Sequence, residues 1–311
     1  VGSEMCIRDR AYSVLKKNLL QENQTYNSNK WDDISRNTKS ENEQRPNVIL
    51  IAIESFSGDF LKAFGNKDNL TPNYDKLANE SIFFTNLYAT GTRTVRGMEA
   101  LTLSVPPTPG NSIVRRPDNQ NLFSVATIFK EKNYQPYFIY GGDGYFDNMN
   151  NFFGGQGFDI VDRNRGNPLS DDIKTQRFNI PDNEVSFENA WGICDEDLYK
   201  QSIKYADKSS KLNKPFFQFV MTTSNHKPYT FPAGKIDLPQ GDRNGAVKYT
   251  DYALGKFWLM QKQNLGSKIL CSSSLPTIVR AVPESGKSIS ISIIFQRLFT
   301  IFLKKRRKSI D

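Results

Sequence analysis

Six consecutive apolar residues, Val48 to Ile53, constrain the fold of this 311-residue chain more than any other stretch. Four of the six are β-branched and no polar residue interrupts them, so they predict a strand buried on both faces. A carboxylate, Glu54, follows directly, at the end of a strand where open α/β sheets place their ligands. The alternative is a solvated glutamate that only ends the strand, and this stretch alone leaves both interpretations open.

Strand and helix patterns alternate through the following two hundred or so residues, which predicts an α/β fold with a mainly parallel sheet and helices on both faces. The expected strands cover residues 48–53, 82–88, 136–140 and 216–221, and the expected helices cover 72–79, 95–104, 122–132, 195–208 and 245–257. Polar clusters follow four strands, at Glu54, Thr90–Thr94, Gly141–Asp143 and Ser224–His226. Parallel strands put these clusters at one edge of the sheet, where we expect them to converge.

The net charge of +8 belongs to the end of the chain, because residues 258–311 contain ten lysines and arginines and only two acids. Residues 1–257 are therefore neutral, and the charge gives no support for nucleic-acid binding by the domain. Residues 11–45 are polar and predict a helix-prone segment and a linker, and the first ten residues are interpreted as a sequencing remnant. Neither a signal peptide nor an apolar run of about 18 residues is visible.

Few residues are suited to a metal site, since His226 is the only histidine and the three cysteines have no metal-type spacing. The acidic triplet at residues 195–197 is interpreted as the first turn of a helix rather than as a metal site. Thr94 ends the segment Thr90-Gly-Thr-Arg-Thr94 and begins an expected helix, where free backbone N–H groups stabilise negative charge. Its hydroxyl could act as a nucleophile if a metal held by Glu54 lowered its pKa. A simple N-cap is the alternative for this threonine.

Six motifs in order, PNVILIAIESFSG, GTRTVRGMEAL, YGGDGYFDNMNNFF, WGICDEDLY, MTTSNHKPY and KYTDYALGKF, resemble the lipoteichoic acid synthase-like branch of the sulfatase and alkaline phosphatase superfamily. The resemblance covers residues 46–257 and implies a sulfatase-like fold. It also implies a phosphoglycerol transferase with an extracytoplasmic catalytic domain, anchored in the membrane by a preceding segment that this chain does not contain. Donor and acceptor would be phosphoglycerol-bearing lipids or glycans, with no nucleic acid as partner.

By this resemblance Glu54 is a ligand to a divalent cation, Mn²⁺ or Mg²⁺, and Thr94 is both a ligand and the nucleophile that carries the phosphoglycerol. His226 matches the substrate-binding histidine, although a lone histidine is more often structural. Asp143 falls in the headgroup-binding loop. In the family an aromatic residue and an arginine follow this Gly-Asp pair, whereas this chain has Phe146, Asp147 and Met149 nearby, which puts the headgroup in doubt. A true sulfatase would have a cysteine or serine followed by x-Pro-x-Arg, and none of the three cysteines of this chain is followed by that sequence. A phosphodiesterase and a non-catalytic protein that binds glycan or lipid headgroups remain alternatives.

The family completes its metal site with an Asp-His pair on a later strand, and no histidine follows His226 here. The α/β pattern and the acids are lost at the same place, after Phe257. Residues Gln261 to Val279 can be encoded by codons that, when read one base out of frame, translate into a segment that ends in A-A-D-H-C. We therefore interpret residues 258–311 as a frameshifted translation and residues 46–257 as an incomplete catalytic domain. From this interpretation we expect weak metal binding, little activity and no sheet strand from the tail.

Overall fold

The structure is a computed structural model that describes residues 2–20, 22, 24–38, 45–85, 89, 93–106, 108–263, 274–279 and 290–296. The chain divides into two compact units, residues 1–45 and 46–311. In the first unit, helix α1 (Gly2–Leu19) is followed by an antiparallel pair of short strands, β1 (Gln24–Tyr26) and β2 (Arg36–Thr38). The helix includes most of the first ten residues, although their sequence shows no helical periodicity.

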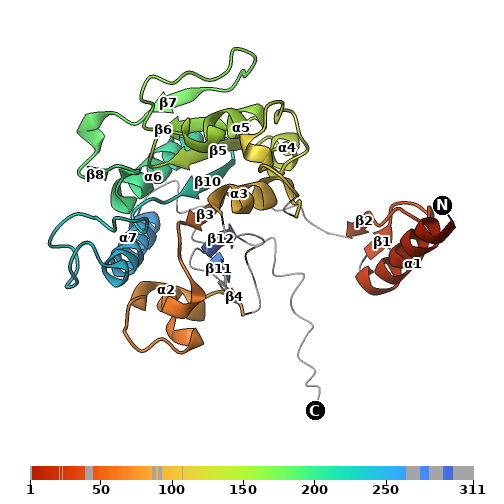
Figure 1. Ribbon diagram of the computed structural model, residues 1–311, viewed down its shortest axis with the longest axis horizontal. Helices are drawn as coiled ribbons and strands as arrows, with labels where there is room; N and C mark the ends of the chain where they lie inside the picture. The colour runs from red at the N-terminus through yellow and green to blue at the C-terminus, as the bar shows by residue number, and fades with distance from the viewer. Residues whose placement is uncertain are drawn as a thin grey trace. The chain divides into compact units, whose positions relative to one another are not determined.

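An eight-stranded sheet organises the second unit, in the order β4-β11-β12-β3-β10-β5-β6-β7 (Figure 1). Five neighbouring strands pair in parallel: β3 (Val48–Ile53), β10 (Phe216–Met221), β5 (Gln135–Tyr140), β6 (Asp159–Asp162) and β7 (Arg177–Asn179). Beyond β3 lie β12 (Ser290–Gln296), which is antiparallel to it, then β11 (Ser274–Val279) and β4 (Ile82–Phe84). The expected mainly parallel sheet is confirmed.

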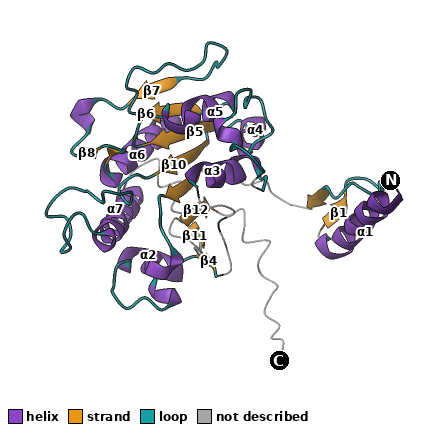
Figure 2. Ribbon diagram, in the orientation of Figure 1, coloured by secondary structure: helices purple, strands orange, loops and turns teal. Residues whose placement is uncertain are grey.

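Helices cover both faces of this sheet, as the sequence predicted (Figure 2). One face packs against α2 (Pro72–Asn79), α6 (Asp195–Lys211) and α7 (Arg243–Gln263), and the other against α3 (Thr94–Leu103), α4 (Val125–Glu131) and α5 (Met149–Gly155). Alternate residues of β3 enter the two cores, with Ile49, Ile51 and Ile53 in the first and Val48, Leu50 and Ala52 in the second. A strand between two helical layers is buried on both faces, which explains the unbroken apolar run from Val48 to Ile53.

Short elements complete the domain. They are the hairpin of β8 (Glu188–Asn189) and β9 (Gly192–Ile193) and five 3₁₀ turns: η1 (Gly58–Phe60), η2 (Lys62–Phe64), η3 (Ile113–Arg115), η4 (Phe146–Asn148) and η5 (Asp182–Glu184). Neither α5 nor β6 was predicted, because a helix of sequence MNNFFGG contains poor helix formers and a four-residue strand carries too little periodicity. Within the described residues, no helix combines the length and the hydrophobicity that crossing a bilayer requires.

The expectation that residues 258–311 contribute no strand is wrong for two segments. Strand β12 pairs with β3, with Ile291 opposite Ala52, and β11 pairs with β12 and with β4. Serine and isoleucine alternate at the start of β12, a local strand pattern that outweighs the basic composition of the tail as a whole. The remainder of the tail, residues 264–273, 280–289 and 297–311, lies outside the described residues.

Candidate active site

Glu54 lies where β3 ends, in the middle of the sheet, and the loop after β10 holds its backbone. Its N–H donates to Oγ1 of Thr222 at 3.0 Å, and its carbonyl accepts from Nδ2 of Asn225 at 2.9 Å. The next residue, Ser55, has a φ of 51°, so the chain turns sharply in the left-handed region as it leaves the strand. The side chain of Glu54 is buried at 7% exposure. The glutamate is therefore fixed in place and is not the solvated strand end of the alternative interpretation.

Thr94 is the first residue of α3, and its hydroxyl reaches the Glu54 carboxylate. Thr94 Oγ1 donates to Oε2 at 3.1 Å, and Ser55 Oγ donates to Oε1 at 2.8 Å, so each carboxylate oxygen accepts one hydroxyl. The N-cap of α3 is Arg93, which makes no capping bond with its side chain. The alternative of Thr94 as a simple N-cap therefore does not hold. The helix begins among backbone N–H groups that favour negative charge beside the Thr94 hydroxyl.

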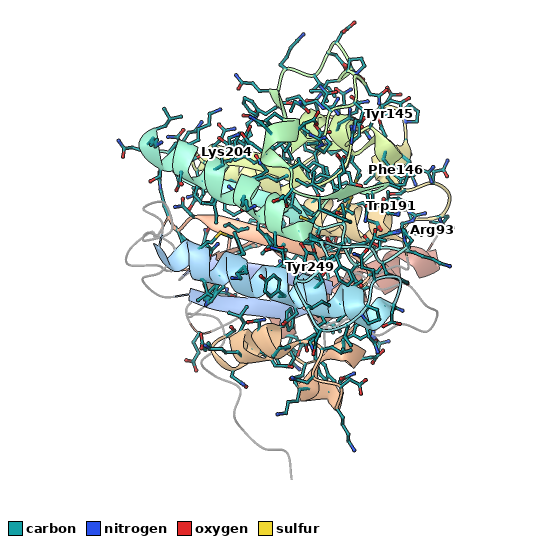
Figure 3. The ribbon with its side chains drawn as sticks, turned by 90° about the vertical axis from the view of Figure 1, so that its left-hand side faces the viewer. Arg93, Tyr145, Phe146, Trp191, Lys204 and Tyr249 are labelled. Atoms are coloured by element: carbon teal, nitrogen blue, oxygen red, sulfur yellow. The ribbon has the colours of Figure 1, made fainter. Side chains whose placement is uncertain are left out.

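A cavity of about 470 Å³ opens beside these two residues and is lined by Glu54, Thr94 and His226. The structure thus brings together three of the four residues singled out in the sequence. Figure 3 shows Phe146, Trp191 and Arg93 close together along one edge of the molecule, and all three line the same cavity. The cavity combines aromatic rings, two carboxylates and two guanidinium groups, a composition suited to a polar ligand with an organic part.

The His226 ring contacts the Trp191 ring in a tilted arrangement, with ring centroids 3.8 Å apart and an angle of 39° between the planes. Both rings are held by the carbonyl oxygen of Lys227, which lies 2.9 Å from His226 Nδ1 and 2.7 Å from Trp191 Nε1. A carbonyl oxygen only accepts, so Nδ1 carries the proton and Nε2 of the neutral ring is left as an acceptor. Sequence reasoning missed Trp191, whose only signal was an aromatic residue within the motif WGICDEDLY.

Asp143, predicted to bind the headgroup, is not among the cavity-lining residues. Its carboxylate accepts from the backbone N–H groups of Tyr145 (3.0 Å) and Arg165 (3.2 Å), from Asn167 Nδ2 (2.9 Å) and from Arg177 Nη2 (2.7 Å). Burial would raise the pKa of Asp143, but these hydrogen bonds and the Arg177 charge outweigh it, and the pKa is lowered. With its acceptor sites occupied inside the protein, Asp143 holds the loop that follows it in place.

The acidic triplet that starts at Asp195 is the first turn of α6, as predicted. Asp195 is fully buried, and its carboxylate accepts from the backbone N–H groups of Thr223 (3.2 Å) and Ser224 (3.0 Å) and from the Thr250 hydroxyl (2.8 Å). Burial raises the pKa of Asp195, and the same hydrogen bonds oppose this effect. The residue therefore anchors the loop that carries His226 to two helices.

The Glu54 carboxylate and the Thr94 hydroxyl are oxygen ligands of the kind that Mg²⁺ and Mn²⁺ prefer. Within the part of the chain that the structure describes, no cluster of three or more histidine, cysteine, aspartate or glutamate side chains is positioned to hold a metal. The described residues therefore fit one side of a divalent cation site and do not complete it.

Comparison with known proteins agrees with this geometry. The Sulfatase family profile matches residues 46–265. The chain is 26% identical over 220 residues to lipoteichoic acid synthase 2 of Bacillus subtilis, covering 69% of this chain and 31% of that protein. It is 27% identical over 210 residues to phosphoglycerol transferase I of Salmonella paratyphi B, covering 64% of this chain and 26% of that protein. The chain thus spans less than a third of the length of these curated relatives.

Two solved structures extend the comparison to the fold. A protein of the alkaline phosphatase superfamily from Vibrio parahaemolyticus superposes with a TM-score of 0.68 and 36% identity, over 82% of this chain and 61% of that one. A lipoteichoic acid synthase from Listeria monocytogenes superposes with a TM-score of 0.61 and 20% identity, over 80% and 65% of the two chains. The resemblance drawn from the six motifs is confirmed, and the chain belongs to the sulfatase family of the alkaline phosphatase superfamily.

Proposed function

We propose that the protein from which this chain derives is a metal-dependent phosphoglycerol transferase that works through a phosphothreonine at Thr94. The observation that carries the proposal is the hydrogen bond between Thr94 and the buried Glu54 at the wall of a cavity. The names of the two curated relatives support the same reaction class. The acceptor would be a lipid or a glycan, and the enzyme would act outside the cytoplasm in association with the membrane.

In the proposed reaction the Thr94 oxygen attacks the phosphorus of a phosphoglycerol lipid. A P–O bond forms to Thr94 while the P–O bond to the lipid alcohol breaks, and the proton from Thr94 balances the departing alkoxide. The Lys227 carbonyl occupies Nδ1 of His226, which leaves Nε2 for the substrate. An acceptor hydroxyl then attacks the phosphothreonine and restores the free threonine. Water in place of that alcohol would make the protein a phosphodiesterase, which is the alternative reaction of the same site.

A divalent cation, Mn²⁺ or Mg²⁺, would be held by Glu54 and Thr94 together with ligands beyond the described residues, and would neutralise phosphoryl charge and lower the pKa of the attacking hydroxyl. Because the family's Asp-His pair is absent from the sequence, we expect this chain to bind metal weakly and to show little activity. Without the Asp-His pair the protein could alternatively bind headgroups and carry out no catalysis. The nucleotide sequence separates them: an Asp-His pair in another frame near codon 277 supports the enzyme.

The test of the proposal uses a frame-restored protein and measures Mn²⁺-dependent release of glycerol phosphate from phosphatidylglycerol. Thr94→Ala is expected to abolish release and the covalent phosphoryl label. Thr175→Ala, the same substitution at a threonine that does not line this cavity, is the matched control and should keep most of both. Release that persists in Thr94→Ala would refute the phosphothreonine route.

A further inference from the structure

Two turns of the chain contribute residues to the cavity that Thr94 lines. One is the turn η4, where Asp147 and Asn148 have φ values of 54° and 62°. Aspartate and asparagine tolerate this left-handed region better than other residues with side chains, so the sequence permits the sharp turn. The turn places Asp147 among the residues that line the cavity.

The other segment is the turn η3, which is fixed to both α3 and η4. Buried Glu99 of α3 accepts from Ser112 Oγ and from the Ile113 backbone N–H, each at 2.6 Å. On the other side, Nδ2 of Asn148 donates to the carbonyl of Val114 at 3.2 Å. The turn therefore has a defined position relative to the helix that begins with Thr94.

Arg115 ends η3 and lines the cavity together with Asp147. Its Nε lies 3.2 Å from Oδ1 of Asp147, and its side chain is 54% exposed. Its two terminal nitrogens make no hydrogen bond to any described residue, so the pair with Asp147 leaves the forked end of the guanidinium available. Arg93, beside Thr94, is the second cation in the cavity wall.

We propose that Arg115, oriented by Asp147, binds the phosphate of the ligand in this cavity, and that the ligand is an anionic phosphate ester. The inference rests on the proposed function and names the residue that selects for the phosphate. A planar guanidinium with both terminal nitrogens available matches two phosphate oxygens, which a lysine or an amide does not. An exposed ion pair without a ligand is the plain alternative, and such pairs contribute little to stability.

The experiment uses His226 as the reporter, because it lines the same cavity and is the only histidine of the chain. The imidazole signals of the isotope-labelled chain are followed by NMR at constant ionic strength. Glycerol 1-phosphate, inorganic phosphate and glycerol are added in separate titrations. We expect a saturable shift with glycerol 1-phosphate, a weaker one with inorganic phosphate and none with glycerol.

Arg115→Gln should raise the apparent Kd for glycerol 1-phosphate about tenfold, which is the effect of losing one charge-assisted contact. Arg115→Lys, which keeps the charge without the fork, should recover part of the affinity. The control is Arg116→Gln, because Arg116 bonds Asn111 and Thr108 and does not line the cavity. That variant should bind as the unaltered chain does.

Equal affinities of Arg115→Gln and the unaltered chain would overturn the inference and leave the proposed function standing. Equal weakening by Arg116→Gln would also overturn it, because the effect would then be one of net charge. Inorganic phosphate binding as tightly as glycerol 1-phosphate would refute the ester as ligand. The absence of any saturable shift in the unaltered chain would likewise refute it. Failure of the proposed function shows separately, as release by the frame-restored Thr94→Ala protein.

Discussion

The hydroxyl oxygen of Thr94 lies 3.1 Å from a carboxylate oxygen of Glu54, although the two residues are 40 positions apart. Glu54 follows the last residue of the strand β3, and Thr94 begins the helix α3, which packs on that strand. Val95 and Met98 of the helix belong to the same core as Leu50 and Ala52 of the strand. Nucleophile and carboxylate thus belong to one packed unit, and their spacing does not depend on a flexible loop.

The first prediction concerns Mn²⁺ binding to this chain. A ligand that binds only the folded state raises Tm, so millimolar Mn²⁺ should give a small increase through its weak site at Glu54. Glu54→Gln removes the charge while it keeps an oxygen for the neighbouring hydroxyls, and should abolish the increase. Differential scanning fluorimetry measures the effect, with Glu80→Gln at an exposed position as control. An increase that survives Glu54→Gln would place the bound metal elsewhere.

A second prediction follows from Glu99, which is buried in α3 and bonds Arg96, Ser112 and Ile113. Burial would raise the pKa of Glu99, but the three hydrogen bonds and the Arg96 charge outweigh it, and the pKa is lowered from 4.5. Glu99→Gln should therefore lower the free energy of unfolding by about 2 kcal/mol at pH 7.

The sign of the pH effect follows from this lowered pKa. In the folded state Glu99 resists protonation more than in the unfolded state. Its contribution to the free energy of unfolding is therefore complete above pH 4.5 and is lost as the pH falls through the lower pKa that Glu99 has in the folded state. The difference between the original chain and Glu99→Gln in urea unfolding should shrink below pH 4.5. A difference that stays constant as the pH falls would mean that the ionised carboxylate is not what stabilises the turn η3.

The sequence was sufficient to predict the positions of those site residues that lie at the ends of regular strands and helices. An unbroken run of six apolar residues, four of them β-branched, favours a strand between two layers, and the residue after such a strand lies at the carboxyl edge of the sheet. Regular elements thus predicted where Glu54 and Thr94 lie, whereas the roles given to both residues came from the resemblance of the six motifs. The placement depends on local patterns of the sequence.

The part of the cavity wall formed by η3 and η4 could not be predicted, because turns build it. Arg115 and Asp147 meet through two turns whose register depends on side-chain bonds to backbone groups, which leave no periodic signal. For Asp143 the motif predicted a role in headgroup binding, but the partners that occupy its carboxylate come from residues 165–177, where the sequence has no pattern.

The third prediction separates the two roles considered for Asp143. Because Arg177 is 7% exposed and bridges Asp143 and Asp162, Asp143→Asn leaves a buried guanidinium with one carboxylate instead of two. We expect a loss of about 2 kcal/mol in unfolding free energy, with weaker ligand binding only as a consequence. Urea unfolding measures the loss, and Asp171→Asn at an exposed position is the control. Unchanged stability together with weaker phosphate-ester binding would restore Asp143 as a binding residue.

The last prediction concerns the tautomer of His226. Since the Lys227 carbonyl can only accept, the neutral ring should carry its proton on Nδ1, and ¹⁵N NMR distinguishes this nitrogen from an unprotonated Nε2. Trp191→Phe keeps an aromatic ring beside His226 but removes the indole N–H from the same carbonyl, so the tautomer should persist. Trp191→Ala removes both and should populate the second tautomer. Trp31→Ala, in the unit formed by residues 1–45, serves as control. If Nε2 carried the proton in the unaltered chain, the histidine would present a donor to the substrate, and the proposed orientation of its ring would be wrong.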